Sequence, residues 1–214
     1  LVGSEMCIRD RPETGSIIDI SGLDDTKDQS FTGSTTTMAG SWSGFSDNLS
    51  GIVSYEYAVG TNALQTDLKP WTTVELDTIV SDGSFSLSNS ETYHISVRAI
   101  DAVGNISLPV SSDGITADHE GPYGLTAVDG DSIDIERQNI VDSYRGHWSL
   151  FSDDLSGLMS HEYALYDSTG TSYVSNWDTV GLDTVAIISD INLITEHIYP
   201  VSYTHLRAHE TLRY

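Results

Sequence analysis

Apolar and polar residues alternate along much of this chain with a period of two. The clearest run spans 92–100, where one side of the alternation is formed by Tyr93, Ile95, Val97 and Ala99. Because successive side chains of a β-strand point to opposite faces, this pattern predicts a half-buried strand. Thr, Ser, Val and Tyr are frequent elsewhere, and Gly and Asp interrupt the runs at short intervals. This composition favours strands over helices.

The same patterning divides the first half of the chain into seven predicted strands. They are expected at 17–22, 35–43, 53–60, 70–76, 83–88, 92–100 and 108–116. Short strands separated by turn-forming residues are typical of an antiparallel β-sandwich.

A long internal repeat shows that this unit occurs twice. The segment WSGFSDNLSGIVSYEYA begins at Trp42, and WSLFSDDLSGLMSHEYA begins 106 positions later, at Trp148. The spacing stays constant as far as Tyr93 and Tyr199. A repeat of this length is the size of a domain, so the sequence predicts a tandem array of small all-β domains.

Both ends of the chain differ from this pattern. Leu1–Arg11 and Val201–Thr211 resemble translations of the same sequencing-adapter DNA read in its two directions, so we interpret 1–11 and 201–214 as adapter-derived and exclude them from the fold. The exclusion removes Cys7, which is the one cysteine.

The remaining sequence predicts two domains, at 12–118 and 119–200. The second is truncated, because its native sequence stops before the sixth and seventh strands. The alternation nevertheless continues through Val201, Tyr203 and His205, so the terminal string can imitate a sixth strand.

Several of these features together resemble a fibronectin type III domain. They are Trp42 on the second strand, Tyr55 and Tyr57 on the third, and the segment TYHISVRAIDAVGN at 92–105. The resemblance implies a seven-stranded sandwich with Trp42 and Trp148 in its cores. It also implies that Tyr93 and Tyr199 form the tyrosine corner, in which the hydroxyl bonds back across the preceding turn.

Two further segments resemble the fibronectin-like repeats of large bacterial secreted or surface proteins. One is the FSD-x-LSG loop that both copies contain, and the other is the acidic linker SSDGITADHEGP at 111–122. For the loop, we expect Asp47 and Asp153 to accept backbone N–H bonds, while Gly51 and Gly157 supply the turn; the alternative is a ligand-binding loop.

The charge of the chain excludes some partners. Nine Lys and Arg residues against 32 Asp and Glu give a net charge of −23, so nucleic acid would be repelled. No apolar run is long enough to span a bilayer. The native histidines are dispersed, without the i, i+4 spacing of a helical zinc site.

Acidic loops are the candidate chemistry. Asp129, Asp131 and Asp134 form a D-x-D-x-x-D pattern that suits Ca²⁺, and their counterparts in the first copy are expected to be Asp24, Asp25 and Asp28. The alternative is a solvated acidic loop, since the complete EF-hand pattern is missing. A second hypothesis is a calcium ion that bridges the two domains, between Asp24, Asp25 and Asp28 on one side and Asp118, Glu120, Asp153 and Asp154 on the other.

No motif for a nucleophile elbow, a phosphate loop or a dinucleotide site is present. The sequence therefore predicts a non-catalytic structural or adhesive segment of a large extracellular or cell-surface protein, with no required cofactor and with calcium as a candidate ligand. Its expected partners are protein or carbohydrate ligands and neighbouring repeats of the same chain. The alternative is an accessory spacer or binding region of an extracellular hydrolase.

Overall fold

The computed structural model describes residues 11–23, 27–124, 126–130, 134–149 and 151–207, the last seven of these by their backbone alone. The chain divides into two compact units, Leu1–His119 and Glu120–Tyr214, which are treated separately below. Every element of regular structure in the described residues is a β-strand. No helix among those residues has the length and apolar character that crossing a membrane requires.

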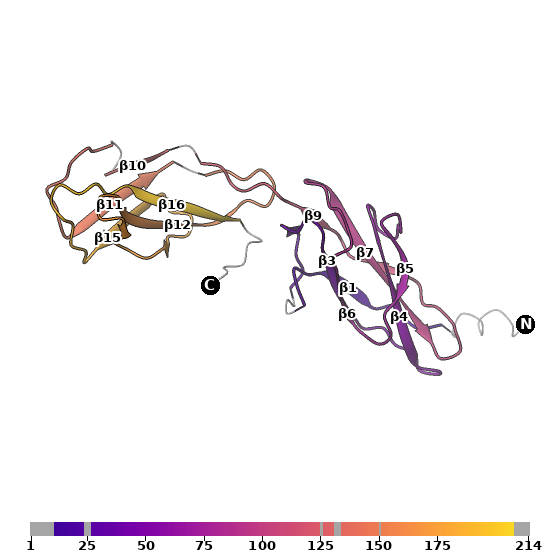
Figure 1. The fold of residues 1–214 in the computed structure, drawn as a ribbon. Helices are drawn as coiled ribbons and strands as arrows, with labels where there is room; N and C mark the ends of the chain where they lie inside the picture. Colours follow the sequence, from indigo (N-terminus) through magenta and orange to yellow (C-terminus); the bar gives the residue numbers. More distant parts are fainter. Residues whose placement is uncertain (1–10, 24–26, 125, 131–133, 150, 208–214) are drawn as a thin grey trace, which may run out of the picture. The chain divides into compact units, whose positions relative to one another are not determined.

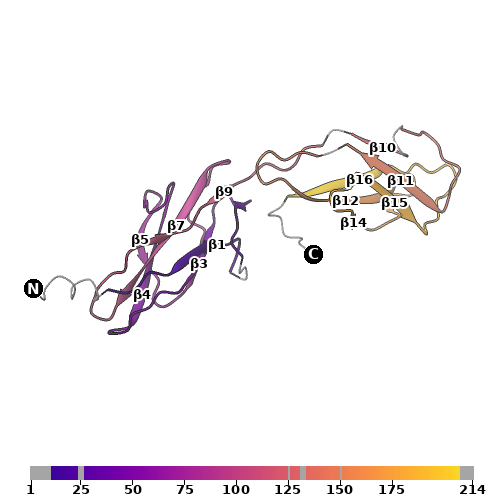
Figure 2. The same cartoon turned by 180° about the vertical axis from the view of Figure 1, so that it is seen from behind.

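The first unit is a sandwich of two sheets (Figures 1 and 2). One sheet is antiparallel and has the order β1 (Ser16–Asp19), β3 (Met38–Ser43) and β6 (Ile79–Asp82). The other has the order β2 (Phe31–Thr32), β9 (Ile115–Ala117), β7 (Thr92–Asp101), β4 (Ile52–Gly60) and β5 (Lys69–Thr73), with β8 (Val110–Ser111) also paired to β7.

This strand order confirms the expected fold class, an all-β fibronectin type III-like sandwich. The first two expected strands form one layer with β6, and the sixth expected strand, β7, lies between β4 and β9 in the other. All of these pairings are antiparallel except that of β2 with β9.

The expected fifth strand at 83–88 was wrong in position, because β6 occupies Ile79–Asp82. Ser84 N–H donates to the Asp82 carboxylate at 3.0 Å, and this local turn interrupts the ladder. Two later residues still bond across to the neighbouring segment, with Phe85 and Leu87 donating to the carbonyls of Thr36 and Thr35. The alternating pattern therefore predicted correctly that 83–88 lies beside a neighbouring segment, but it did not predict where the regular β-ladder ends.

The expected last strand at 108–116 is divided into β8 and β9. Gly114 lies between them with φ +108°, a backbone conformation that side-chain-bearing residues rarely adopt. A Cβ at this position would lie 2.6 Å from the His94 ring. Gly114 is thus required both for its backbone angle and for the close approach of the chain to β7.

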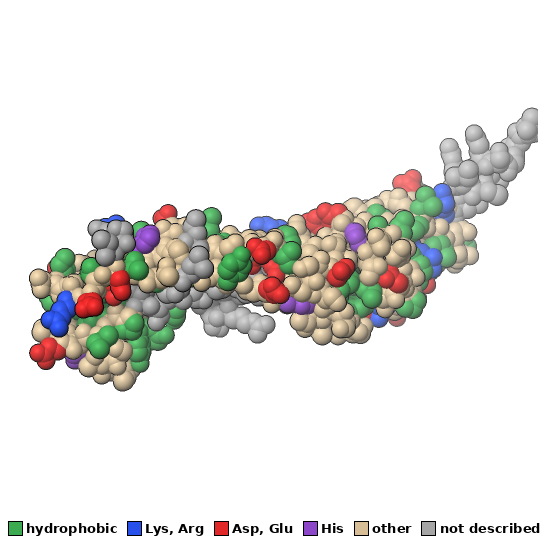
Figure 3. Space-filling view, turned by 90° about the horizontal axis from the view of Figure 1, so that it is seen from above, with side chains coloured by type: hydrophobic (Ala, Val, Ile, Leu, Met, Phe, Trp, Pro, Cys, Tyr) green, Lys and Arg blue, Asp and Glu red, His purple; other side chains and the backbone are tan. Residues whose placement is uncertain are grey.

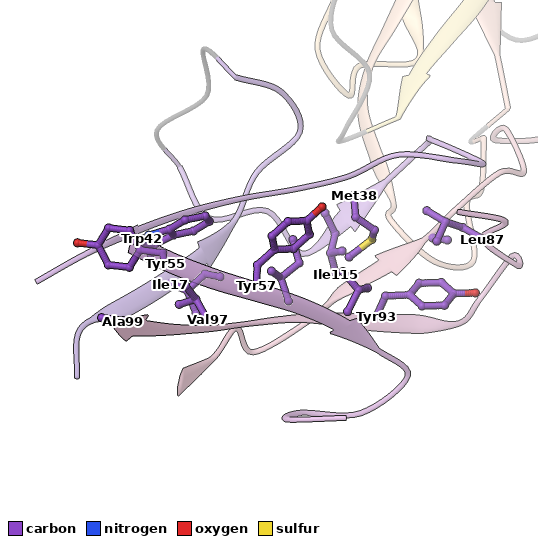
Figure 4. Close-up of a cluster of buried hydrophobic side chains, with 13 residues drawn as sticks. Ile17, Met38, Trp42, Tyr55, Tyr57, Leu87, Tyr93, Val97, Ala99 and Ile115 are labelled. Atoms are coloured by element: carbon purple, nitrogen blue, oxygen red, sulfur yellow. The ribbon is translucent and has the colours of Figure 1, made fainter. Parts of the chain in front are cut away.

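The core of the first unit lies between the two layers (Figure 4). Trp42 is 3% exposed and meets Tyr55 edge to face, with ring centroids 5.8 Å apart. The apolar face predicted for 92–100 is also buried there. The core role implied for Trp42 is confirmed, and truncating such a residue to Ala costs about 3–5 kcal/mol.

The second unit repeats these pairings. One sheet has the order β10 (Ala127–Asp129), β11 (Ser143–Trp148) and β15 (Val185–Ser189). In the other, β12 (Leu158–Asp167) pairs with β13 (Ser172–Tyr173), β14 (Asp178–Thr179) and β16 (Val201–Arg207). Trp148 is 1% exposed, as its core role implies, and packs against the buried His161, which stands at the repeat position of Tyr55.

The backbone of β16 takes the place of the sixth strand. Tyr163 pairs with Tyr203 in the second unit, and Tyr57 pairs with Val97 at the same repeat positions in the first. The terminal string thus continues the sheet in the expected register. Among the residues described, no strand pairs with the other edge of β16.

Both tyrosine corners are present. The Tyr93 hydroxyl accepts a hydrogen bond from Ser88 N–H at 2.8 Å. The Tyr199 hydroxyl accepts one from Ile194 N–H at 2.6 Å, at the same repeat positions. In each unit a side chain at the start of the sixth strand therefore satisfies a backbone donor in the preceding loop.

Candidate metal centre

A buried carboxylate lies at the end of the first strand. Asp19 is 0% exposed, and its Oδ2 accepts a hydrogen bond from Gly114 N–H at 3.1 Å. Its other oxygen, Oδ1, is also buried and has no hydrogen-bond partner among the residues that the structure describes. Burying a carboxylate oxygen without a hydrogen-bond partner costs folding free energy, so a donor or a cation bound to Oδ1 would be stabilising.

The surroundings of Asp19 favour its protonated form. Burial raises its pKa to about 7, although hydrogen bonds from the Ser112 hydroxyl and the Gly114 N–H oppose the shift. The negative charges of Asp28 and Asp113 raise the pKa further.

Asp28 and Asp113 complete a cluster with Asp19. One carboxylate oxygen from each residue lies within 4.8 Å of those of the other two. Asp28 Oδ1 also accepts a hydrogen bond from the backbone N–H of Asp19 at 3.0 Å, which fixes the loop before β2 against the end of β1. Asp113 precedes Gly114 in the bend between β8 and β9. Asp28 and Asp113 are exposed, while Asp19 forms the closed end of the cluster.

Oxygen atoms with this spacing can surround one hard cation. Calcium–oxygen distances are about 2.3–2.6 Å, so two ligand atoms of one ion are separated by at most about 5 Å. The three acidic side chains supply hard oxygen ligands and no imidazole or thiolate, which favours Ca²⁺ or Mg²⁺ over softer metals.

Sequence reasoning identified one of these three residues. Asp28 belonged to the predicted set, while Asp24 and Asp25 lie outside the described residues. Asp19 was missed because it looks like the polar end of a strand, and Asp113 because no local spacing links it to the others. The carboxylates of Asp19 and Asp113 meet only through the packing of the first strand beside the last.

The predicted residues of the second unit form a related pair. Asp129 N–H donates to Asp134 Oδ1 at 3.4 Å, which repeats the bond from Asp19 to Asp28. Asp131 lies outside the described residues.

The strand register corrects the expected counterpart of Asp129. Asp19 pairs with Gly40 and Asp129 with Gly146, so Asp129 corresponds to Asp19 and not to Asp24 as expected. The constant repeat spacing predicted the wrong counterpart because the connection between the first two strands is shorter in the second unit.

The two units differ in the side chain that lies beside the carboxylate at the end of the first strand, which is Asp19 in the first unit and Asp129 in the second. In the second unit the Tyr144 hydroxyl donates to Asp129 Oδ1. Burial, followed by this bond, raises the pKa of Tyr144, so its hydroxyl stays a donor. In the first unit the position of Tyr144 in the register is held by Met38, which has no hydroxyl to donate.

The repeated FSD-x-LSG loops have a structural role, as predicted. Asp47 Oδ1 accepts bonds from Ser50 N–H at 2.7 Å and from Gly51 N–H at 2.8 Å. These backbone donors, that of Gly51 foremost, lower the pKa of Asp47. Asp153 accepts the bond from Gly157 N–H at 2.8 Å in the same way. Gly51 and Gly157 both have φ +74° and supply the turn.

Three of the residues expected to bridge the two domains, Asp118, Asp153 and Asp154, have contacts within their own units, while Asp24 and Asp25 lie outside the described residues. Asp118 is 1% exposed, and its backbone N–H bonds to the Thr32 carbonyl. The Asp153 carboxylate holds its loop, and Asp154 accepts a hydrogen bond from the Tyr123 hydroxyl at 3.3 Å. Calcium bridging between the units stays a prediction.

Acidic side chains are spread over the visible face of both units, with few Lys or Arg residues between them (Figure 3). Most acids are therefore solvated charges of the surface. Asp19 differs from them because it is buried and one of its oxygens is unpaired.

Comparison with known proteins adds one structural likeness. No protein-family model matches the chain, and no curated protein is significantly similar to it. A crystal structure of the chicken CNTN1 FN1-FN3 domains is similar to this chain at 14% sequence identity and a TM-score of 0.33. The similarity covers 92% of this chain and 62% of the other, which is less than two thirds of its length. The fold assignment rests on the strand order described above.

Proposed function

We propose that this chain is a non-catalytic structural and adhesive segment of a large extracellular or cell-surface protein. The observation that carries the proposal is that the residues shared by the two units have the same structural task in each. Trp42 and Trp148 fill the cores, and Asp47 and Asp153 shape the same turn. Repeating one sandwich in this way lengthens a protein without requiring new chemistry.

An exposed aromatic group of the second unit supports a contact role. Tyr173 is 54% exposed and Trp177 43% exposed, with ring centroids 6.2 Å apart, and the Tyr166 ring meets that of Tyr173 edge to face at 5.1 Å. Aromatic rings at a surface combine a large apolar area with a polar group, which suits protein or carbohydrate ligands. Binding of the chain to a panel of polysaccharides, and its loss in Trp177→Ala, tests this part of the proposal.

The gene on both sides of this segment tests the main proposal. We expect further copies of the W-S-x-F-S-D pattern, as in a stalk or an adhesin. A catalytic domain directly adjoining the segment would instead support the accessory region of a hydrolase. Turnover of glycoside or peptide substrates by the purified chain, lost on substitution of a particular side chain, would overturn the non-catalytic assignment.

We further propose that 1–11 and 201–214 are adapter-derived and that the native protein is bacterial. The similarity of both strings to one adapter read in two directions supports the adapter origin, and the resemblance of the FSD-x-LSG loops and the acidic linker to bacterial surface repeats supports the bacterial origin. An independently prepared library should show native codons beyond Tyr199 that read like the first unit after Tyr93. Recovery of the same terminal string from an independent clone would refute the adapter origin.

A further inference from the structure

We propose that the first unit binds one calcium ion between Asp19, Asp28 and Asp113, at the end of the sandwich where β1 stops and the chain bends into β9. This site is separate from the structural and adhesive role proposed above. It also differs from the sets predicted from sequence, since two of its three residues were in neither of them.

Asp19 is 0% exposed, and its buried Oδ1 has no donor among the described residues. A solvated acidic cluster does not have this feature, because each of its oxygens can bond to water. A bound cation would supply the missing partner and compensate the buried charge.

The two units differ at the end of the first strand. Each has an aspartate at the end of its first strand whose backbone N–H donates to the carboxylate of a following loop aspartate. In the second unit the Tyr144 hydroxyl meets that carboxylate, whereas Met38 holds the corresponding position in the first. The first unit has Asp113 near the carboxylate in addition. The first unit therefore lacks this tyrosine hydroxyl at the strand end, and a cation would supply the partner that the hydroxyl supplies in the second unit.

The ligand set of this cluster suits calcium better than magnesium. Asp28 and Asp113 come from exposed loops and Asp19 from a strand, so the ligand set is partly rigid and partly adaptable. Ca²⁺ accepts variable geometry and six to eight oxygen ligands, with water completing its shell. Mg²⁺ demands a near-ideal octahedron and gives up its water reluctantly. Calcium is the better fit.

Calorimetric titration of CaCl₂ into the full chain, after treatment with a chelator, tests the site. We expect one saturable binding event that is lost in both Asp19→Asn and Asp113→Asn. Two controls should retain it: Asp129→Asn, the matched strand-end residue of the second unit, and Asp77→Asn, an exposed acid outside the cluster. Because Asp113 is exposed, its variant should fold even if Asp19→Asn does not.

Two further readouts make the result specific. Without calcium, Asp19→Asn should raise the melting midpoint, because it removes a buried carboxylate with an unpaired oxygen, and calcium should then no longer shift that midpoint. In the unsubstituted chain calcium should slow hydrogen exchange in peptides covering Asp19 and Gly114, and should leave a peptide covering β11 unchanged.

Three outcomes would overturn the proposal. The first is the absence of saturable binding, in which case a proton on Asp19 balances the cluster. The second is equal binding by the Asp113→Asn variant, or equal loss in the Asp77→Asn control. The third is binding of MgCl₂ as tight as that of CaCl₂, which would refute calcium as the ligand.

Discussion

The Tyr144 hydroxyl donates a hydrogen bond to Oδ1 of Asp129 and so pairs the carboxylate at the end of the first strand of the second unit. Both residues lie on strands of one sheet, β11 and β10, and Tyr144 is buried. The corresponding carboxylate of the first unit, Asp19, has an unpaired oxygen instead. The carboxylate at the same strand end is thus hydrogen-bonded to a hydroxyl in one unit and has an unpaired oxygen in the other.

Tyr144→Phe should destabilise the second unit. The substitution keeps the ring in the core but removes the donor to Asp129, and such a loss costs about 1–3 kcal/mol. Urea unfolding of the full chain measures the effect. Tyr173→Phe is the matched control, because Tyr173 is 54% exposed, and it should unfold like the unsubstituted chain. Equal stability of the two variants would show that the hydroxyl of Tyr144 contributes nothing.

The tyrosine corner of the first unit should contribute a modest stabilisation. Tyr93→Phe removes the acceptor for Ser88 N–H while leaving the buried ring in place, so we expect a loss of about 0.5–1.5 kcal/mol. Tyr199→Phe should have a similar effect on the second unit, since the same bond is present there. The unfolding transitions of the two variants should therefore move separately. A loss confined to one variant would contradict an equivalent role for the two corners.

The acid stability of the first unit should depend on Asp82. Its carboxylate lies 2.7 Å from Lys69 Nζ and accepts a 2.7 Å hydrogen bond from the Tyr57 hydroxyl. Burial opposes ionisation, but the bonds from Lys69, Ser84 and Tyr57 outweigh it and hold the pKa of Asp82 far below its usual 3.8.

A lowered folded-state pKa stabilises the fold at a pH above the ordinary value. The contribution of Asp82 is complete above about pH 5 and is lost as the pH falls through 3.8 toward the lower folded-state pKa. Thermal melts between pH 2 and pH 7 should show a shallower acid decline for Asp82→Asn than for the unsubstituted chain. Asp77→Asn serves as the charge-matched control, and an identical decline in all three proteins would contradict the assignment.

Completing the sheet beside β16 should stabilise the second unit. Val201 pairs with Leu165 as Ile95 pairs with Val59, so the first-unit segment 95–117 can replace 201–214 in register. The replacement brings the partners that β8 and β9 provide for β7, and it covers the open edge. We expect a higher denaturant midpoint for the second unit in the chimera. A chimera that carries only 95–101 has the strand but no neighbour, and an equal gain from it would show that the open edge has no cost.

Much of the fold followed from short-range patterns. The alternation at 92–100 predicted both ends of β7 to within one residue. Burial of one face of a strand requires apolar residues at every second position, so the strand is visible in the sequence. The repeat assigned Trp148 and Tyr199 the roles of Trp42 and Tyr93, and the structure agrees. Turn chemistry was equally local, since the Asp47 carboxylate reaches only to Gly51.

The predictions from sequence were wrong where one local pattern was overridden by another feature of the chain. Residues 83–88 contain alternating apolar positions, yet the bond from Ser84 to Asp82 turns the chain and ends the ladder at β6. The repeat spacing likewise misassigned the counterpart of Asp129, because a constant offset cannot reveal that one inter-strand connection is shorter.

By itself, the sequence determined the class of fold, its duplication, the core residues and the turns. These depend on neighbours a few positions apart, or on the alternation that a half-buried strand imposes. Only the tertiary structure decided which carboxylates meet. Asp19, Asp28 and Asp113 come from a strand and two loops, and no spacing in the chain encodes their approach. The register of two sheets and the bend at Gly114 bring them together, and whether a hydroxyl or another acid then faces the strand end depends on residues that are far apart in sequence.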